Sequence, residues 1–196
     1  MFDKISRLIR FNLRYLGQPP WDTGVSPPEL IDFLESGMPG RALDVGCGTG
    51  TNLLTMASYD WQVVGVDIAL LSVLKARWKL HQAGVQGRVQ FGNVAGLLQL
   101  TESFDLVLDM GCYHSLGPRE RVVYHDNLIR WLAPGGTYLQ YAHLQTNSSD
   151  PHGVSDDDFL QFSRYLDLQW RKDNAEHRPD DGGGRPATWA RFERPF

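Results

Sequence analysis

The sequence predicts an α/β fold, in which helices cover both faces of a doubly wound, mostly parallel β-sheet. Three observations lead to this class. Strand-like and helix-like patterns alternate from residue 41 to residue 143. A glycine-rich turn, LDVGCGTGTN at residues 43–52, directly follows the first predicted strand. Near the end of the chain, two strand-like segments are joined too closely for a helical crossover, so we expect them to pair antiparallel.

The individual elements follow from apolar periodicity and from residues that start or stop helices. Proline near position 28 starts a helix, and Pro134-Gly135-Gly136 ends another. Ser155 and Asp158 form a capping box before an apolar run, so a further helix begins there. These signals predict helices over residues 28–36, 51–58, 69–83 and 118–132. The predicted strands span residues 41–45, 62–66, 88–91, 104–109, 137–143, 166–176 and 187–194.

The first 17 residues predict an amphipathic helix rather than a secretion signal, because they lack a continuous apolar centre. No apolar run in the chain is long enough to cross a bilayer. We therefore expect the apolar face of this helix to dock on the domain's own core rather than on a membrane surface. That face consists of Phe2, Ile5, Leu8, Ile9, Leu13 and Leu16, and the opposite face of Lys4, Arg7, Arg10 and Arg14.

Composition limits the possible partners. The 196 residues predict one folding domain, and the net charge of −4 with a pI near 5.8 disfavours a broad nucleic-acid surface. Two cysteines, Cys47 and Cys112, are too few for a disulfide framework or for a zinc site of their own. We expect a cytoplasmic protein with no metal.

The glycine-rich turn predicts a site for a polar ligand. Gly46, Gly48 and Gly50 allow backbone conformations closed to other residues, and the helix start that follows offers free N–H groups. One ligand that such a turn can bind is a nicotinamide dinucleotide, as in an oxidoreductase. However, Thr51 stands where its fingerprint has a third glycine. Asp44, directly before the turn, would repel a pyrophosphate but suits a cationic amino-acid ligand.

From about residue 20 to its end, the chain resembles class I S-adenosylmethionine-dependent methyltransferases. ALDVGCGTG, VVGVDI, FDLVLDMGCYHSL and LAPGGTYLQYA resemble four of that family's motifs and occur in the family's order. The resemblance implies a Rossmann-like sheet of seven strands with an antiparallel last strand, which agrees with the final strand pair. It also implies an N-terminal helix and lid segment at residues 1–27 and a methyltransferase domain at residues 28–196.

The same resemblance implies S-adenosyl-L-methionine as the cofactor. Asp67 would accept hydrogen bonds from the ribose hydroxyls, and Asn93 would accept one from the adenine amino group. Turn or helix capping is the structural alternative for Asp44 and Asp67, and a plain loop role is the alternative for Asn93. The implied cofactor-binding residues are Trp21, Asp44, Gly46, Cys47, Gly48, Gly50, Asp67, Ile68, Asn93, Val94 and Asp109.

QPPWDTGVSPPEL, residues 18–30, resembles the N-terminal segment of thiol/halide and thiopurine methyltransferases. In that subgroup the segment folds over the cofactor, which would place Trp21 beside the sulfonium, where an aromatic face favours a cation. An aromatic anchor for the N-terminal helix is the alternative role for Trp21. The partial resemblance implies a small-molecule acceptor, such as a thiol or another soft nucleophile.

Candidate catalytic residues follow the fourth predicted strand, at the carboxyl edge where such sheets bind ligands. Tyr113 and His114 would orient or deprotonate the acceptor, and His114 has the better-suited ordinary pKa. Loop packing is the alternative for both. Tyr141 and His143, after the fifth strand, are further pocket candidates. A non-catalytic protein that only binds S-adenosylmethionine is the competing function.

Overall fold

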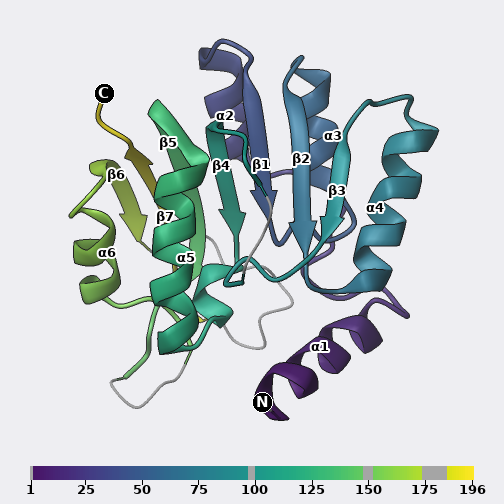
Figure 1. Cartoon of the computed structure of the whole chain (residues 1–196), viewed down its shortest axis with the longest axis horizontal. Helices are drawn as coiled ribbons and strands as arrows, with labels where there is room; N and C mark the ends of the chain where they lie inside the picture. The colour runs from purple at the N-terminus through teal and green to yellow at the C-terminus, as the bar shows by residue number, and fades with distance from the viewer. Residues whose placement is uncertain (1, 97–99, 148–151, 174–184) are drawn as a thin grey trace. The chain divides into compact units, whose positions relative to one another are not determined.

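A computed structural model describes residues 2–96, 100–147, 152–173 and 185–196 of the chain (Figure 1). It contains two compact units, Met1–Val94 and Ala95–Phe196, which are treated separately below. The end of the predicted strand at residues 174–176 and most of the predicted turn RPDDGGGRP lie outside the described residues. The predicted boundary between residues 27 and 28 stays a prediction.

The first unit is built on three parallel strands in the order β3-β2-β1. Leu43 of β1 pairs with Val64 of β2, and Val66 of β2 pairs with Gln90 of β3. Because all three strands run in the same direction, their carboxyl ends meet at one edge. The elements of this unit are α1 (Phe2–Arg14), α2 (Pro28–Ser36), β1 (Arg41–Val45), α3 (Thr51–Ser58), β2 (Gln62–Asp67), α4 (Leu70–Gln82) and β3 (Arg88–Phe91).

Helix boundaries in this unit coincide with the expected start and stop residues. Helix α2 begins at Pro28, whose missing N–H costs nothing in a first helical turn. The residue before α3 is Gly50, with φ at 83°, and α4 ends just before Gly84, with φ at 67°. Both glycines adopt the left-handed conformation that other residues avoid. Glycines in this conformation therefore lie just before α3 and just after α4.

Helix α1 departs from its predicted packing. Ile9, Leu13 and Leu16, expected to be buried, are 52, 58 and 71% exposed. The helix docks instead through the neighbouring face. The Asn12 Oδ1 atom accepts a hydrogen bond from the backbone N–H of Leu71 in α4, at 3.2 Å, and Tyr15, just after the helix, is buried. The docked face is rotated because a polar Asn and a Tyr find hydrogen-bond partners there, which apolar periodicity does not record.

The second unit has the strand order β4-β5-β7-β6, in which β7 runs antiparallel to both of its neighbours. Strand β5 begins five residues before its predicted start, with an irregularity where its pairing with β4 passes from Leu132 to Thr137. Gly135, with φ at 73°, lies within that irregularity, so the prolyl-glycine stretch belongs to the strand rather than to a helix stop. The elements of this unit are β4 (Phe104–Met110), the 3-10 turn η1 (Tyr113–Ser115), α5 (Pro118–Trp131), β5 (Leu132–His143), α6 (Asp156–Phe162), β6 (Asp167–Asp173) and β7 (Ala187–Glu193).

An aromatic core joins helices and sheet in this unit. Tyr138 of β5 contacts Tyr124 of α5, Phe162 of α6 and Phe192 of β7, with ring centroids 5.3–6.5 Å apart. All four side chains are buried, and α5 lies in front of the strands in Figure 1. Helix α6 starts at the predicted capping box, where the Ser155 backbone N–H donates to the Asp158 carboxylate at 2.8 Å.

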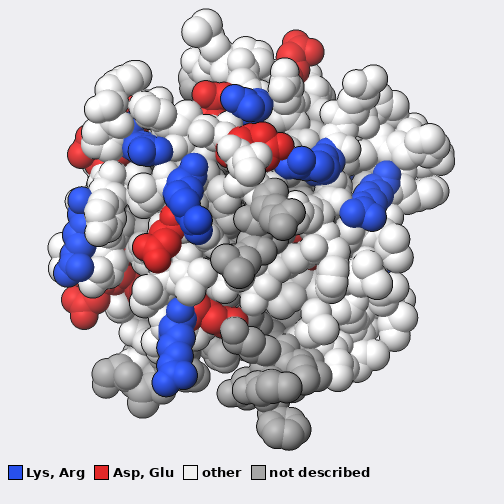
Figure 2. All heavy atoms as spheres, viewed as in Figure 1, with Lys and Arg blue, Asp and Glu red and all other residues white. Residues whose placement is uncertain are grey.

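The predicted fold class is confirmed: the seven strands, their alternation with helices and the antiparallel β7 are those of a Rossmann-like, doubly wound fold. Basic and acidic side chains are interspersed on the face that Figure 2 shows, without a broad patch of one sign. Among the helices that the structure describes, none has the length and apolar character required to traverse a membrane.

Candidate functional site

The glycine turn between β1 and α3 is the centre of the site in the first unit. Gly46, Gly48 and Gly50 all have positive φ, at 77°, 53° and 83°. The backbone N–H groups of Gly46 and Cys47 both donate to the Val66 carbonyl, at 2.7 and 3.1 Å, so the turn is tied to the end of β2. A side chain at these positions would be strained by the positive φ, and the backbone is exposed at Gly46, half-buried at Gly48 and buried at Gly50.

Asp67 ends β2 and ties the turn to α4. Its Oδ2 atom accepts a hydrogen bond from the Gly48 N–H at 2.9 Å, and its Oδ1 atom accepts one from the Ala69 N–H at 2.7 Å. Burial raises the pKa of Asp67, and these two backbone N–H groups oppose the rise. The capping role considered from the sequence is therefore present. The predicted contact between Asp67 and the ribose hydroxyls stays a prediction.

The other predicted cofactor residues of this unit gather at the same edge of the sheet. Asp44 is buried at the end of β1, and Asn93 and the buried Val94 follow β3. Half-buried Ile68 follows Asp67 directly. Carboxyl ends of parallel strands share one edge, so the three strands bring acids and amides together there. This edge is where doubly wound sheets bind nucleotides.

Cys47 has a packing role. It is buried, and a Cβ built on Gly65 of β2 would lie 2.8 Å from its sulfur and 2.7 Å from Leu53. The small residue at 65 and the cysteine thus fit against each other under the turn. This agrees with a structural rather than reactive thiol.

The segment after α1 lies on the glycine turn. The indole N–H of Trp21 donates to the Tyr15 hydroxyl at 3.1 Å, and a Cβ on Gly48 would lie 3.0 Å from that hydroxyl. The Thr49 hydroxyl donates to the Asp22 carboxylate at 2.7 Å. Two side chains of the segment therefore touch the turn directly, and Tyr15 is a site residue that the sequence did not single out. An aromatic residue directly after an amphipathic helix is common, so the sequence alone does not distinguish Tyr15 as a site residue.

Trp21 contacts the helix as well as the turn. Its ring meets those of Phe11 and Tyr15 edge-on, with centroids 6.0 and 6.4 Å apart. The Arg14 guanidinium lies 5.0 Å from the Trp21 ring centroid. The anchoring role is thus present, and the indole is 37% exposed. The predicted contact between Trp21 and a sulfonium stays a prediction.

In the second unit, Asp109 holds the loop that follows β4. Its side chain is completely buried. Its carboxylate accepts hydrogen bonds from the Cys112 N–H at 2.7 Å, the Tyr113 N–H at 3.0 Å and the Tyr124 hydroxyl at 2.7 Å. Burial raises the pKa of Asp109 to about 6. These hydrogen bonds give Asp109 a positioning role for the loop, and the cofactor contact predicted from the sequence stays a prediction.

Tyr113 is also turned into the core. It is 1% exposed, and its hydroxyl donates to Asp158 at 2.8 Å. Since that proton goes to the carboxylate, His125 Nε2, 2.9 Å away, donates to the same oxygen. The Arg121 guanidinium stacks over the Tyr113 ring and pairs with Asp158 at 2.8 Å. Burial raises the pKa of Tyr113 far above its ordinary value. The Tyr113 hydroxyl thus belongs to a buried network, and the predicted contact between Tyr113 and the acceptor stays a prediction.

His114 keeps the position predicted for it but has a defined tautomer. Its Nδ1 atom accepts a hydrogen bond from the backbone N–H of His143, at 3.1 Å, so the ring proton of the neutral form sits on Nε2. The two rings meet edge-on, with centroids 4.7 Å apart. Burial, followed by the charges of His143 and Arg185, lowers the pKa of His114 to about 3. At neutral pH this imidazole is a hydrogen-bond donor through Nε2 and a poor base.

A strap at residues 152–154 closes over the ends of β4 and β5. The Gly153 N–H donates to the His114 carbonyl at 3.1 Å, and the Val154 N–H donates to the His143 carbonyl at 2.8 Å. Arg121 donates to the Gly153 carbonyl at 2.6 Å. The strap is not apparent from the sequence, because its hydrogen-bond partners lie up to 39 residues apart along the chain. Tyr141 packs edge-on to His143, with centroids 5.9 Å apart.

Comparisons with known proteins agree with this architecture. A family model described as "Methyltransferase domain" matches residues 42–136, which include the glycine turn, Asp67 and the loop after β4. The match begins at β1 and ends within β5, so it covers the parts of both units discussed above.

Among curated proteins, the chain is 26% identical over 155 residues to a 2-heptyl-1-hydroxyquinolin-4(1H)-one methyltransferase of Mycobacteroides abscessus, covering 76% of this chain and 68% of that protein. It is 31% identical over 144 residues to a "Probable thiol methyltransferase 2" of Arabidopsis thaliana, covering 71% of this chain and 64% of that protein. The chain thus spans about two thirds of the length of these relatives.

Solved structures share the fold. A structure from work on the conversion of a disulfide bond into a thioacetal group during echinomycin biosynthesis has a TM-score of 0.79 at 23% identity, covering 96% of this chain and 93% of that chain. The N-methyltransferase NodS of Bradyrhizobium japonicum, in complex with S-adenosyl-l-homocysteine, has a TM-score of 0.76 at 17% identity, covering 97% and 98%. At these identities the likeness concerns the fold alone.

Proposed function

We propose that this chain, which belongs to the S-adenosylmethionine-dependent methyltransferases, transfers a methyl group to the sulfur of a small thiol acceptor. The cofactor is S-adenosyl-L-methionine, whose sulfonium supplies the methyl group. In the proposed reaction a bond forms between the acceptor sulfur and the methyl carbon while the bond from that carbon to the sulfonium sulfur breaks. The products are a methyl thioether and S-adenosylhomocysteine, and the thiol proton goes to solvent.

The hydrogen bond that occupies His114 Nδ1 is the observation that favours a thiol as the methyl acceptor. Of the two side chains that the sequence singled out for proton removal, Tyr113 is buried in a network, and His114 spends its unprotonated nitrogen on the His143 N–H. Neither is arranged to take a proton from an acceptor. A thiol of pKa about 8.5 costs roughly 2 kcal/mol to ionise at pH 7, whereas an aliphatic alcohol costs far more. A site without a base at this position suits an acceptor that ionises by itself.

The residues of the first unit fit the cofactor. The backbone that Gly46 exposes and that Gly48 half-exposes would let the ligand approach the main chain, and Asp67 would accept hydrogen bonds from the ribose hydroxyls. Asn93 would accept from the adenine amino group. In this assignment Asp44 supplies negative charge near the amino-acid end of the ligand.

In the proposed enzyme, the segment around Trp21 acts as a lid. Its contacts to the glycine turn, through Tyr15 and Asp22, would hold it over the cofactor and exclude water from the reacting sulfur. His114 would orient the acceptor by donating from Nε2. Both roles concern alignment and water exclusion, which are what an in-line displacement at the methyl carbon by an ionised nucleophile needs.

A panel of acceptors tests the proposal. Purified protein would be incubated with labelled cofactor and with thiols, phenols, aliphatic alcohols and amines of similar size, while calorimetry measures cofactor binding separately. Thiol methylation at the highest kcat/KM is the expected result. Faster transfer to an oxygen or nitrogen acceptor would overturn the thiol assignment, and tight cofactor binding without turnover of any acceptor would indicate a non-catalytic binding protein.

A further inference from the structure

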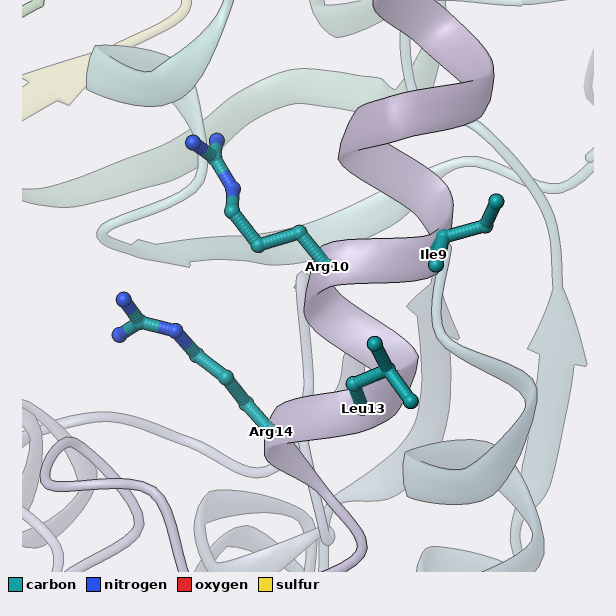
Figure 3. Close-up of a pocket in the computed structure, with 4 residues that line it drawn as sticks. All are labelled: Ile9, Arg10, Leu13 and Arg14. Atoms are coloured by element: carbon teal, nitrogen blue, oxygen red, sulfur yellow. The ribbon is translucent and has the colours of Figure 1, made fainter.

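The exposed face of α1 has a chemistry that the proposed methyl transfer does not use. Ile9 and Leu13 are more than half exposed on the helix. Together with Arg10 and Arg14 they line a shallow hollow of about 530 Å³. Figure 3 shows Ile9 and Leu13 on one side of the helix and the two arginines extended on the other. The helix therefore presents an apolar row next to a cationic row.

Helix α4 of the same unit adds a second apolar row. Leu70, Leu74 and Trp78 recur at four-residue spacing and are 46, 49 and 65% exposed. The residues beside this row hold α1: the Leu71 N–H donates to Asn12 at 3.2 Å, and Lys75 Nζ donates to the Tyr15 carbonyl at 2.7 Å. The two rows thus flank one helix–helix contact. These two rows and Leu16 form a surface that we call the α1–α4 ridge: Ile9, Leu13, Leu16, Leu70, Leu74 and Trp78.

The ridge gathers six exposed apolar side chains from α1, the residues just after it and α4, and apolar residues grouped on a surface mark interaction sites. The charge of α1 indicates the kind of partner. Its 13 residues include four basic side chains and one acidic one, whereas the whole chain has a net charge of −4. A partner that takes both an apolar row and adjacent cations offers hydrocarbon and negative charge at the same boundary. A bilayer with anionic headgroups has this composition.

We propose that the α1–α4 ridge docks on the surface of an anionic membrane. Ile9, Leu13 and the α4 row would enter the boundary between headgroups and acyl chains, and Arg10 would reach the headgroup phosphates with its long side chain. Arg14, whose guanidinium lies 5.0 Å from the Trp21 ring centroid, would add positive charge beside them. Pairing with a second copy through this ridge is less favourable, because a two-fold contact places two cationic helices against each other. This proposal reverses the expectation that the apolar face of the N-terminal helix is buried in the protein.

Vesicle co-sedimentation of the full chain tests the proposal. The vesicles would be phosphatidylcholine alone or phosphatidylcholine with about 30 mol% phosphatidylglycerol, at low and at high salt. We expect binding to the anionic vesicles, falling by about 10-fold or more in the double variant Ile9→Glu/Leu13→Glu. The matched control is Val122→Glu/Leu160→Glu, two apolar residues of other helices that are each 64% exposed. Circular dichroism would establish that both variants fold.

A second readout follows insertion directly. Trp78 fluorescence should shift to the blue on anionic vesicles, and Trp78→Phe should remove that part of the shift. Three results would overturn the proposal: no sedimentation with anionic vesicles at low salt, equal binding to neutral and anionic vesicles, or equal losses in the two double variants. A lipid-free dimer that Ile9→Glu/Leu13→Glu dissociates, in a protein that ignores vesicles, would make the ridge an interface between copies instead.

Discussion

The backbone N–H of His143 donates to His114 Nδ1 across 3.1 Å, and this one contact determines what the imidazole can do. With Nδ1 occupied, the neutral ring carries its proton on Nε2 and offers a donor, not an acceptor. Protonating the ring would break the contact, because both ring nitrogens would then be donors. The hydrogen bond and the surrounding burial therefore act together to keep His114 neutral.

The first prediction concerns the pH profile of His114→Ala. Because the imidazole is a donor, the variant should lose about 10-fold in kcat/KM on a thiol, by the same factor at pH 7 and at pH 9. Rates on the best acceptor at both pH values measure this, with His81→Ala, an exposed residue of α4, as control. A general base would behave differently: its loss would be near 10²-fold or more at pH 7 and small at pH 9, where the thiol ionises unaided.

Asp109 provides a stability prediction. Its pKa is about 6 in the folded state and near 3.8 unfolded, so the folded protein binds more protons between these values. The sign follows: this contribution is fully present below the unfolded pKa and is lost as pH rises through about 6. Relative to Asp109→Asn, the wild type should lose on the order of 3 kcal/mol of unfolding free energy between pH 3.5 and 7.5.

Urea unfolding of both proteins across that range measures the difference, and contributions from other groups cancel between them. The control, Asp126→Asn, changes an exposed carboxylate of α5 and should leave the profile unaltered. If the wild type and Asp109→Asn differ by a constant amount at every pH, the carboxylate titrates normally in the folded state, and its burial has been misjudged.

A third prediction separates strain from crowding in the glycine turn. In Gly48→Ala the backbone has a positive φ, and the added Cβ would lie 3.0 Å from the Tyr15 hydroxyl oxygen. In Gly84→Ala the backbone also has a positive φ, but no atom lies within 4 Å of the added Cβ. Gly84→Ala should cost about 1–2 kcal/mol of stability. Gly48→Ala should cost more and weaken cofactor binding as well. Thermal unfolding and cofactor titration measure the two effects. Adding Tyr15→Phe should recover only the crowding part, and full recovery would show that φ at Gly48 is unimportant.

Asp67→Ala should weaken cofactor binding by about 1.5–3 kcal/mol, the range for hydrogen bonds to a charged group. The variant should also lose stability, because Asp67 holds the N–H groups of Gly48 and Ala69. Calorimetry at a temperature where the variant is folded isolates the binding term, with exposed Asp32→Ala as control. An unchanged dissociation constant would mean that the ribose is held elsewhere and that Asp67 only caps.

Residues that start and stop helices and strands explain why most of the fold was predictable. Helices α2 and α3 and strand β3 have the bounds predicted, because Pro28, the glycine turn and the short apolar runs mark their ends within a few residues. The antiparallel β7 followed from connection length. What the sequence did not predict depended on direction rather than on identity: which face α1 buries, and which way the side chains of Asp109 and Tyr113 point. These are decided by partners such as Asp158, distant in sequence, that periodicity does not register.

The last prediction concerns the lid. Trp21 and Asp22 connect the N-terminal segment to the glycine turn through Tyr15 and Thr49, so loosening either contact should free the segment without unfolding the unit. Trp21→Ala and Asp22→Ala should each lower kcat by roughly 10-fold to 10²-fold, because water exclusion and alignment are lost together. Cofactor affinity should fall much less. Trp78→Ala, an exposed tryptophan of α4, is the matched control for turnover of a soluble thiol.

Hydrogen exchange of residues 15–26 supplies the structural readout for the lid. It should quicken in both lid variants and stay slow in the control, in step with the loss of turnover. Deleting residues 1–24 extends the test. The lid predicts a folded remainder that binds the adenosine end and transfers methyl groups poorly, although Tyr15 and Lys75 lose their contact. Normal turnover by the truncated protein would refute the lid. A truncated protein that cannot fold would assign the segment to the core, because buried Tyr15 would then be stabilising the unit rather than closing it.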